Sequence, residues 1–201
     1  MRIHLASRSP RRRELLTQIG VGFDTLIFRT GGRADPETDE TPLPGEAAVD
    51  YVERVARAKA EHGNRIVGWR NLVQQPILAA DTTLELDGTI IGKPRDEADA
   101  QAILRSLSGR THRVLTGVAL HTQGRSAYRL SASTVQFRPL DEDEIRRYVQ
   151  SGEPMDKAGA YAIQGRAGIF VAHLAGSYSG VVGLPLCETA QLLGMFGYRC
   201  L

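Results

Sequence analysis

The first segment suited to chemistry is a serine-rich turn with four arginines near the N-terminus, SRSPRRR from residue 7. A short apolar stretch before it predicts a strand, and Ser9 and Pro10 are typical of a helix N-cap and first position. Free backbone N–H groups and the positive end of the helix dipole converge at such a turn. Ser7, Arg11 and Arg12 add hydroxyl and guanidinium donors. Because arginine in a first turn opposes the dipole, the segment favours a phosphate site over a capped, solvated helix start.

A carboxylate lies at the centre of the second candidate segment, ILAADTTLELDGTIIGKP. Asp81 follows 77–80, an apolar run that predicts a buried strand, where a carboxylate is unfavourable unless it is paired or binds a metal. Asp87 and Gly88 predict a hairpin that could return Lys93 toward Asp81 and place a cation and a carboxylate in one cleft. An aspartate that only caps a turn is the alternative.

Two further segments carry weaker signals. The acidic loop TDETPLPGE contains Glu40, although loop carboxylates are most often only solvated. The following helix carries Lys59, one of only three lysines in a chain with 22 arginines. Because arginine is the usual surface cation here, a lysine is a candidate for a charge with a specific function. The segment GEPMDKAGAYAIQG has the small residues of a loop packed around a ligand, and Gln164 can both donate and accept, as reading a nucleobase requires. A tightly packed structural turn is an equal alternative there.

Alternating strands and helices must position these residues. Apolar periodicity predicts strands over 2–6, 21–28, 77–86, 89–91, 113–121, 129–137 and 169–174, and helices over 11–19, 46–60, 96–107, 141–150 and 185–195. The second helix is expected to end near His62 and Gly63, and 30–46 is expected to be a surface loop. Strict βαβ regularity is missing, so the predicted class is α/β or α+β with a mixed sheet.

The composition excludes several classes of protein. A chain of 201 residues, 42% of them hydrophobic, can bury a core without disulfides, as a single domain over 1–201 with two fused lobes. A net charge of +2 is too balanced for a surface that coats nucleic acid or anionic lipid. With two cysteines, no signal-peptide pattern and no apolar run of about 20 residues, we expect a cytoplasmic protein without a membrane segment.

Several known catalytic patterns are missing from the sequence. The histidines lack HExxH or other metal-ligand spacing, and neither GxGxxG nor GxxxxGK[ST] occurs. GSYSG at 176–180 places Tyr178 where a nucleophile elbow needs serine. Dinucleotide, P-loop and serine hydrolase sites are therefore unsupported.

Seven segments together resemble the Maf family of nucleoside triphosphate pyrophosphatases, in the family's order and from residue 5 to about 186: SRSPRRRELL, DETPLPGE, ARAKA, AADTTLELDGTIIGKP, LSGRTHRVLTGV, GEPMDKAGAYAIQG and GSYSGVVGLPL. The resemblance implies an elongated mixed sheet flanked by helices, in two lobes around a central cleft, similar to inosine triphosphate pyrophosphatases. It also implies a cytoplasmic enzyme, often a homodimer, that needs a divalent cation, Mg²⁺ or Mn²⁺. The DKAGAYAIQG form resembles the branch that hydrolyses dTTP and UTP, with modified pyrimidine nucleotides as further targets.

Carried over by position, the resemblance makes Asp81 the catalytic carboxylate, as proton acceptor or metal ligand, and Glu40 a second acidic participant in catalysis and metal binding. Residues that meet the substrate are Ser7, Arg11, Arg12, Lys59 and Lys93, and those that set nucleotide choice are Arg11, Thr82 and Gln164. Water would attack the α-phosphorus while these cations offset the charge of the triphosphate.

Two stretches depart from the family pattern: 28–38 is longer than the usual link to Glu40, and 64–75 lengthens the approach to Asp81. We interpret both as surface insertions. A second hypothesis is a nucleotide-binding regulator linked to cell division, without catalysis. The pair Glu40 and Asp81 argues against it, since carboxylates beside phosphates are unfavourable unless a metal lies between them. In either case we expect a small nucleotide ligand and no stable nucleic-acid complex.

Overall fold

The fold is built on one mixed sheet of seven strands. In the computed structural model, which describes residues 2–28 and 38–200, the strands run in the order β2-β1-β3-β5-β6-β7, with β4 beside β3. Their bounds are β1 (Arg2–Leu5), β2 (Gly22–Thr25), β3 (Ile77–Leu86), β4 (Thr89–Ile91), β5 (Thr111–Thr122), β6 (Arg125–Phe137) and β7 (Val171–Ala175). Strand β1 pairs in parallel with β2 and β3, and the remaining pairs are antiparallel. The predicted mixed sheet is confirmed.

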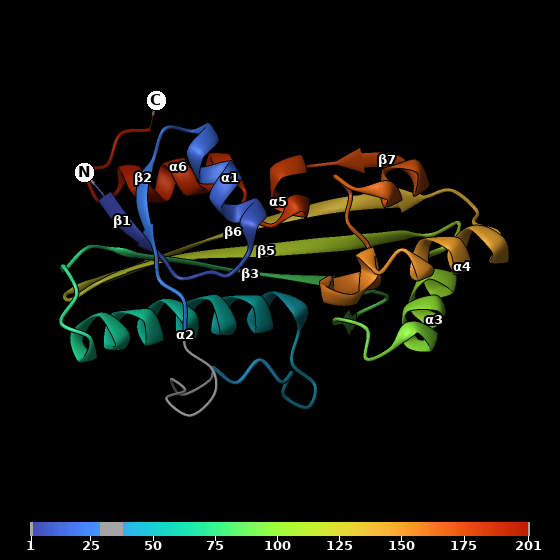
Figure 1. Ribbon diagram of the computed structural model, residues 1–201, viewed down its shortest axis with the longest axis horizontal. Helices are drawn as coiled ribbons and strands as arrows, with labels where there is room; N and C mark the ends of the chain where they lie inside the picture. The colour runs from blue at the N-terminus through green and yellow to red at the C-terminus, as the bar shows by residue number, and fades with distance from the viewer. Residues whose placement is uncertain (1, 29–37, 201) are drawn as a thin grey trace.

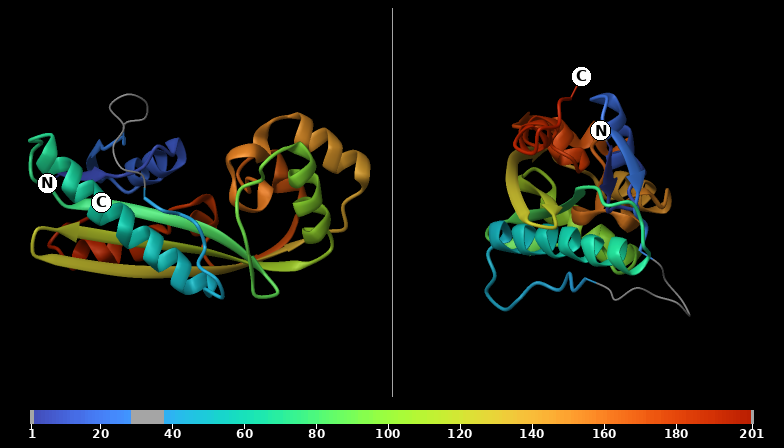
Figure 2. Two further views of the ribbon diagram at one scale, coloured as in Figure 1. Left: turned by 90° about the horizontal axis from the view of Figure 1, so that it is seen from below. Right: turned by 90° about the vertical axis from the view of Figure 1, so that its left-hand side faces the viewer.

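Helices cover both faces of this sheet (Figure 1). The described helices are α1 (Pro10–Gln18), α2 (Ala48–Trp69), α3 (Glu97–Leu107), α4 (Glu142–Gln150), α5 (Tyr178–Val182) and α6 (Leu186–Gly194), with short 3₁₀ helices η1 (Glu153–Asp156), η2 (Ala158–Ala160) and η3 (Arg166–Phe170). Figure 2 (right) shows the sheet with α2 on one side and α1 and α6 on the other. Within the described ranges, no helix combines the length and apolar character needed to cross a bilayer.

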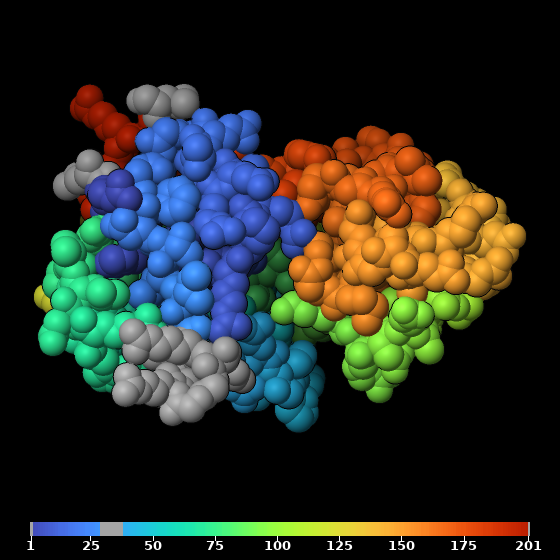
Figure 3. All heavy atoms as spheres, viewed as in Figure 1, coloured from blue at the N-terminus to red at the C-terminus, as the bar shows by residue number. Residues whose placement is uncertain are grey.

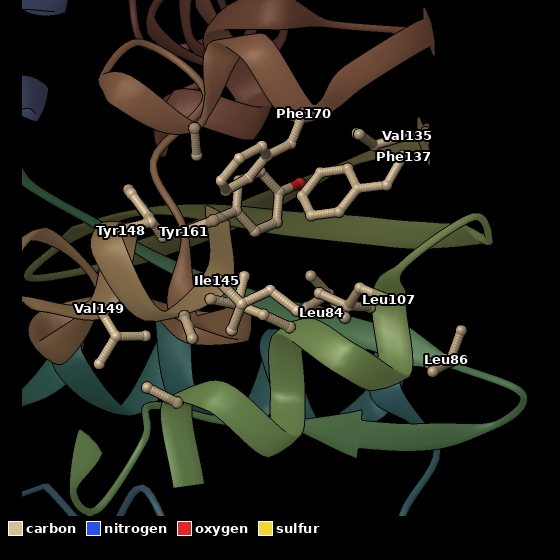
Figure 4. Close-up of a cluster of buried hydrophobic side chains, with 14 of the residues drawn as sticks. Leu84, Leu86, Leu107, Val135, Phe137, Ile145, Tyr148, Val149, Tyr161 and Phe170 are labelled. Carbon is tan, nitrogen blue, oxygen red and sulfur yellow. The ribbon is translucent and has the colours of Figure 1, made fainter. Parts of the chain in front are cut away.

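The long strands β3, β5 and β6 connect two lobes with separate cores. At one end, buried residues of β1, α1, β3, β5 and α6 form a core on one face, and α2 covers the other face. At the other end, α3, α4 and the 3₁₀ helices enclose an aromatic core, separated from the first lobe in Figure 2 (left). Its centre is Phe137, whose ring lies edge-on to Tyr161 and Phe170 (Figure 4). The expected two-lobed, elongated arrangement is present.

Helix α2 is longer than the sequence pattern indicated. The expectation that it ends near His62 and Gly63 is wrong, because the helix continues to Trp69. Ile66 and Val67 are fully buried and extend its apolar face. Gly63 is required by close packing, since a Cβ there would lie 2.7 Å from Ile77 Cγ2. A glycine that signals a helix end by composition is here a contact with β3. Within the expected surface insertion 64–75, Ile66 and Val67 are buried, while Arg65, Gly68 and Trp69 are exposed.

Other boundaries differ less. Strand β2 is only the middle of the predicted strand 21–28. The β3–β4 hairpin is confirmed, with Asp87 and Gly88 both at positive φ, 50° and 79°. Helix α5 and the three 3₁₀ helices were not predicted, because each is five residues or fewer and carries no readable period. Most of the long link 28–38 lies outside the described residues.

Candidate active site

A gap in strand pairing on one edge of β3 places the site. Strand β1 pairs with β3 up to Leu78, and β4 pairs with it from Leu84. Among the described strands none covers this edge between those two residues, and Asp81 and Thr82 lie in the gap. The chain leaves β1 there, turns through Ser7 and enters α1. Open edges where neighbouring strands diverge are common ligand sites in α/β sheets.

A cavity of about 1440 Å³ opens at this gap, between the two lobes. In Figure 3 a notch separates the blue atoms of the N-terminal segment from the orange atoms near residues 150–170, with green atoms at its floor. All nine residues singled out from the sequence line it: Ser7, Arg11, Arg12, Glu40, Lys59, Asp81, Thr82, Lys93 and Gln164. Segments from both halves of the chain therefore meet in one cavity.

Lys59 is the centre of the acidic part of the cavity. Its Nζ lies 2.8 Å from Asp81 Oδ1 and 2.9 Å from Glu40 Oε1. The Lys59 side chain is 15% exposed and that of Asp81 9%, so solvent screens this pair little, whereas Glu40 is 45% exposed. The cation that pairs with Asp81 comes from α2, while Lys93, the lysine expected to fold back toward Asp81, lies elsewhere on the cavity lining.

Glu40 is held in place by α2. The Tyr51 hydroxyl donates to the Glu40 carbonyl at 2.9 Å. Arg54 donates to the Thr41 carbonyl at 3.0 Å and pairs with Glu46 at 2.6 Å. The hydrogen bond from Arg54 lowers the pKa of Glu46 to about 2. Glu46, one of the loop acids of the sequence pattern, therefore fastens the loop, and Glu40 is the loop acid that reaches Lys59.

Arg12 lies on the opposite face of β3 from Lys59 and is fixed by contacts from three segments. Its Nε donates to the Gly183 carbonyl at 2.7 Å, and its Nη2 donates to Thr82 Oγ1 at 3.3 Å. Its Nη1 lies 3.5 Å from Ser7 Oγ. Gly183 has φ 126°, a conformation that favours glycine. Burial lowers the pKa of Arg12, yet a guanidinium stays protonated, so the cavity keeps a fixed positive charge.

A buried hydrogen-bond chain continues from Arg12 behind the cavity. Thr116 Oγ1 donates to the Gly180 carbonyl at 2.7 Å and lies 3.0 Å from Thr82 Oγ1. Because a hydroxyl has one proton and that of Thr116 goes to Gly180, Thr82 must donate to Thr116. Thr82 then accepts from Arg12, and toward the cavity it can only accept. Thr116 was not singled out from the sequence. It can be identified only from the pairing of β3 with β5, which places it opposite Thr82.

The facing side of the cavity belongs to the second lobe. Lys93, Arg95 and Gln164 are exposed there and present their polar ends to solvent. Behind them Tyr161 is buried, and its hydroxyl lies 2.9 Å from Nε2 of the fully buried His112. Burial lowers the pKa of His112 to about 4. We call Ser7, Arg12, Lys59, Asp81 and Thr82 the inner wall, and Lys93, Arg95 and Gln164 the outer wall.

The cavity concentrates positive charge. Among the described residues seven cationic side chains line it against four carboxylates. Lys157, also on its lining, is paired with Asp156. Burial, with added repulsion from Arg11 and Lys93, lowers the pKa of Lys157. Burial likewise lowers the pKa of Arg11. Cations from both lobes therefore repel one another until a polyanion lies between them, which suits a triphosphate.

The residues present fit a hard divalent cation. Asp81 and Glu40 both direct a carboxylate oxygen at one point, now taken by the Lys59 ammonium. Carboxylate oxygens are the ligands Mg²⁺ and Mn²⁺ prefer, and Mg²⁺ is commonly held by one or two carboxylates together with substrate phosphates. No group of three or more His, Cys, Asp or Glu that could hold a metal ion occurs within residues 2–28 and 38–200. A protein-only metal cage is therefore not what this donor set offers.

Comparisons with known proteins agree with this geometry. The profile of the Maf family, described as Maf-like protein, matches residues 2–196. A Dechloromonas aromatica protein named dTTP/UTP pyrophosphatase is 69% identical over 199 residues, covering 99% of each chain. One of the same name from Aromatoleum aromaticum is 64% identical over 198 residues, covering 98% of this chain and 96% of the other.

A solved structure shares the architecture. The Staphylococcus aureus Ham1 protein aligns with a TM-score of 0.52 at 14% identity, covering 98% of this chain and 97% of that chain. At that identity the likeness shows the fold alone. The fold is thus found beyond the curated relatives.

Proposed function

Because the chain belongs to the Maf family, we propose that it is a nucleoside triphosphate pyrophosphatase that hydrolyses dTTP and UTP to the monophosphate and pyrophosphate. The observation that carries the proposal is the meeting of Asp81, Glu40 and Lys59 in a cavity lined by cations from both lobes. A phosphate-binding role alone gives no use for two carboxylates at that point. Hydrolysis of a phosphoanhydride uses both kinds of group.

Substrate binding follows from charge. A nucleoside triphosphate carries about four negative charges, which must be offset before water can approach the α-phosphorus. Arg11, Arg12 and Ser7 approach from the β1–α1 turn, Lys59 from α2 and Lys93 from the segment after β4. Arg12 is the most firmly placed of them, so we assign it to fixing the phosphate chain in one geometry.

The reaction needs one proton acceptor and a stabilised leaving group. Water oxygen forms a bond to the α-phosphorus while the bond from that phosphorus to the oxygen bridging to the β-phosphorus breaks. The water's proton passes to a carboxylate of the Asp81 and Glu40 pair, and the pyrophosphate leaves with its charge held by Lys59, Lys93 and the arginines. Asp81 is the better placed acceptor because it lies on the rigid central strand and is buried.

Asp81 and Glu40 would also hold the divalent cation, Mg²⁺ or Mn²⁺, in this proposal. When bound, it supplies charge neutralisation at the phosphates and lowers the pKa of water. The protein's part is to aim both carboxylates at one point: Asp81 through β3, Glu40 through the contacts of its loop with Tyr51 and Arg54.

Nucleotide choice is assigned to Arg11, Thr82 and Gln164. Gln164 lies at the exposed rim of the outer wall, where its amide can pair with a base edge, and Thr82 offers only an acceptor to the cavity. We further place the enzyme in the cytoplasm, as a homodimer without a stable nucleic-acid complex. The balanced charge of +2 supports the last point.

The test is pyrophosphate release from dTTP, UTP, CTP, GTP and 7-methyl-GTP with Mg²⁺ or Mn²⁺, with an Asp81→Asn variant beside the wild type. Release from dTTP and UTP that the variant loses is the expected result. Nucleotide binding by equilibrium dialysis without release from any of the five would instead support a non-catalytic regulator. Release only from 7-methyl-GTP would reject the proposed nucleotide choice.

A further inference from the structure

Lys59 lies between the two carboxylates that the proposed function assigns to the divalent cation. We propose that the Lys59 ammonium takes the place of that cation in the nucleotide-free enzyme, and that the cation binds together with the triphosphate, which draws Lys59 away from Asp81 and Glu40. This inference rests on the proposed function and adds to it the form of the substrate, a metal–nucleotide complex.

The geometry makes the two cations compete. Lys59 Nζ is 2.8 Å from Asp81 Oδ1 and 2.9 Å from Glu40 Oε1, so the ammonium lies within hydrogen-bond distance of both oxygens. A Mg²⁺ ion binds carboxylate oxygens at about 2.0–2.1 Å. An ion that took these same two oxygens would occupy the space of the ammonium. Either the lysine or the metal can bridge the pair, but not both.

The charges favour the lysine until a nucleotide arrives. Lys59 and Asp81 are mostly buried, so an ammonium displaced by a metal would stay close to the new dication with few other partners. A triphosphate brings about four negative charges and provides the displaced ammonium with phosphate oxygens to bind. Metal and nucleotide should therefore bind with positive coupling, each strengthening the other.

Two further observations support the proposal that the cation binds together with the nucleotide and not before it. Over the described part of the chain the acidic pair is not joined by a third His, Cys, Asp or Glu into a metal-binding group, so phosphate and water oxygens must complete the metal's shell. Arg12, by contrast, is fastened by Gly183 and Thr82. Lys59 has a flexible stem and its partners are the carboxylates, so it is the inner-wall cation able to move.

The first experiment measures Mn²⁺ binding without nucleotide, by the electron paramagnetic resonance signal of free Mn²⁺. Wild type, Lys59→Met, Lys59→Arg and Lys93→Met are compared. Loss of the competing charge in Lys59→Met should tighten Mn²⁺ binding about tenfold or more. Lys59→Arg, which keeps the charge, and Lys93→Met, which removes a cation that does not touch the carboxylates, should bind like wild type. A Lys59→Met/Asp81→Asn double variant should lose the gain.

The second experiment repeats the titration with a UTP analogue that has a methylene group in place of the α,β-bridging oxygen. Wild type should bind Mn²⁺ much more tightly with the analogue than without it, and Lys59→Met should show a smaller increase, since its carboxylates are already free. Thermal unfolding checks each variant, and Lys59→Gln is a second uncharged replacement if Lys59→Met fails to fold.

Equal Mn²⁺ affinity of wild type and both uncharged variants would overturn the inference. So would a gain in Lys93→Met as large as that in Lys59→Met, because it would show a general effect of cavity charge. If the proposed function is wrong, the result differs: no nucleotide releases pyrophosphate, while the differences in Mn²⁺ affinity between the variants stay as expected.

Discussion

The inner and outer walls of the cavity differ in how their polar side chains are held. In the inner wall, Arg12 is fixed by Gly183 and Thr82 by Thr116 before any ligand binds, whereas Lys59 is held only by the two carboxylates from which we propose that it moves. The outer wall presents Lys93, Arg95 and Gln164 from exposed positions. Its well-packed residues lie beneath these exposed side chains, where Tyr161 contacts His112 and Phe137 in the aromatic core.

This difference separates two tasks. Groups that stabilise a transition state act best when they need no reorganisation, and Arg12 and Thr82 of the inner wall meet that condition. Groups that sort related bases tolerate adjustment, and exposed side chains can adjust with little loss of packing. We therefore expect substitutions of Asp81 and Arg12 in the inner wall to act mainly on turnover, and substitution of Gln164 in the outer wall to act mainly on the choice between nucleotides.

The largest effect is expected for Asp81→Asn. Loss of the carboxylate should lower kcat for dTTP and UTP by about 100- to 1000-fold, because both proton acceptance and charge balance fail. Steady-state pyrophosphate release measures it, with Asp143→Asn on the exposed face of α4 as control. Turnover of Asp81→Asn within threefold of wild type would break the assignment of chemistry to the inner wall.

The next effect concerns the support of the outer wall and its dependence on pH. The pKa of His112 is about 4 in the folded protein, against 6.5 when exposed. Between these values the unfolded chain binds the extra proton, so the free energy of unfolding should fall by up to about 3 kcal/mol as pH drops from 6.5 to 4. Urea unfolding at several pH values measures this.

A His112→Gln variant isolates that contribution from those of carboxylates such as Glu46 and Glu144, whose stabilising effect is lost between their pKa of 4.5 in the unfolded chain and about 2 in the folded protein, and is common to both proteins. The stability difference between wild type and variant should shrink as the pH falls. A difference that stays constant from pH 7 to pH 4 would contradict a neutral, buried His112.

A smaller effect is expected for Thr116→Val, which removes one buried hydroxyl behind the inner wall. Thr82 loses its acceptor and Gly180 its donor, so Arg12 is less well placed, and kcat/KM should fall about tenfold, mainly through kcat. Thr116→Ser should restore the value, and Thr134→Val on β6 is the matched control. If Thr116→Ser is as impaired as Thr116→Val, the hydroxyl chain is not what matters.

The smallest effect is expected at the rim of the outer wall. Gln164→Ala should reduce the preference for UTP over CTP about threefold with little change in kcat, because an exposed hydrogen bond contributes little net energy. The ratio of kcat/KM for the two nucleotides measures it, with the exposed neighbour Arg166→Ala as control. A large loss of kcat in Gln164→Ala would erase the distinction between the walls.

Local patterns predicted much of the fold. The Asp87-Gly88 hairpin and the helices over 96–107 and 141–150 were expected, and the structure adds that these helices start at a cap from Asp96 and at a capping box of Asp141 and Glu144, which depend on adjacent residues. The predicted length of helix α2 was too short because Gly63 was interpreted as a helix end. In the structure Gly63 lies inside the helix, where it makes room for Ile77, fourteen residues further along the chain. Packing between elements overrides a local signal at that point.

The site was predictable as a set of residues but not as a set of contacts. Sequence motifs brought out both Asp81 and Lys59, yet they favoured Lys93 as the cation near Asp81. Which lysine reaches the carboxylate depends on how α2 lies across β3, a tertiary arrangement that spacing does not encode. Thr116 was missed for the same reason, since its role exists only through the β3–β5 register.

Asp81 and Thr82 are consecutive residues on opposite faces of β3, and this has an evolutionary consequence. A substitution at Thr82 changes the α1 face of the strand and leaves the Lys59 contact on the α2 face intact, so point mutation could alter the nucleotide choice that we propose for Thr82 without disturbing Asp81. Deletion or insertion of one residue between the two pairing regions of β3 would exchange the faces and lose both functions at once. Within such a lineage, β3 should vary in composition at Thr82 while its length stays invariant.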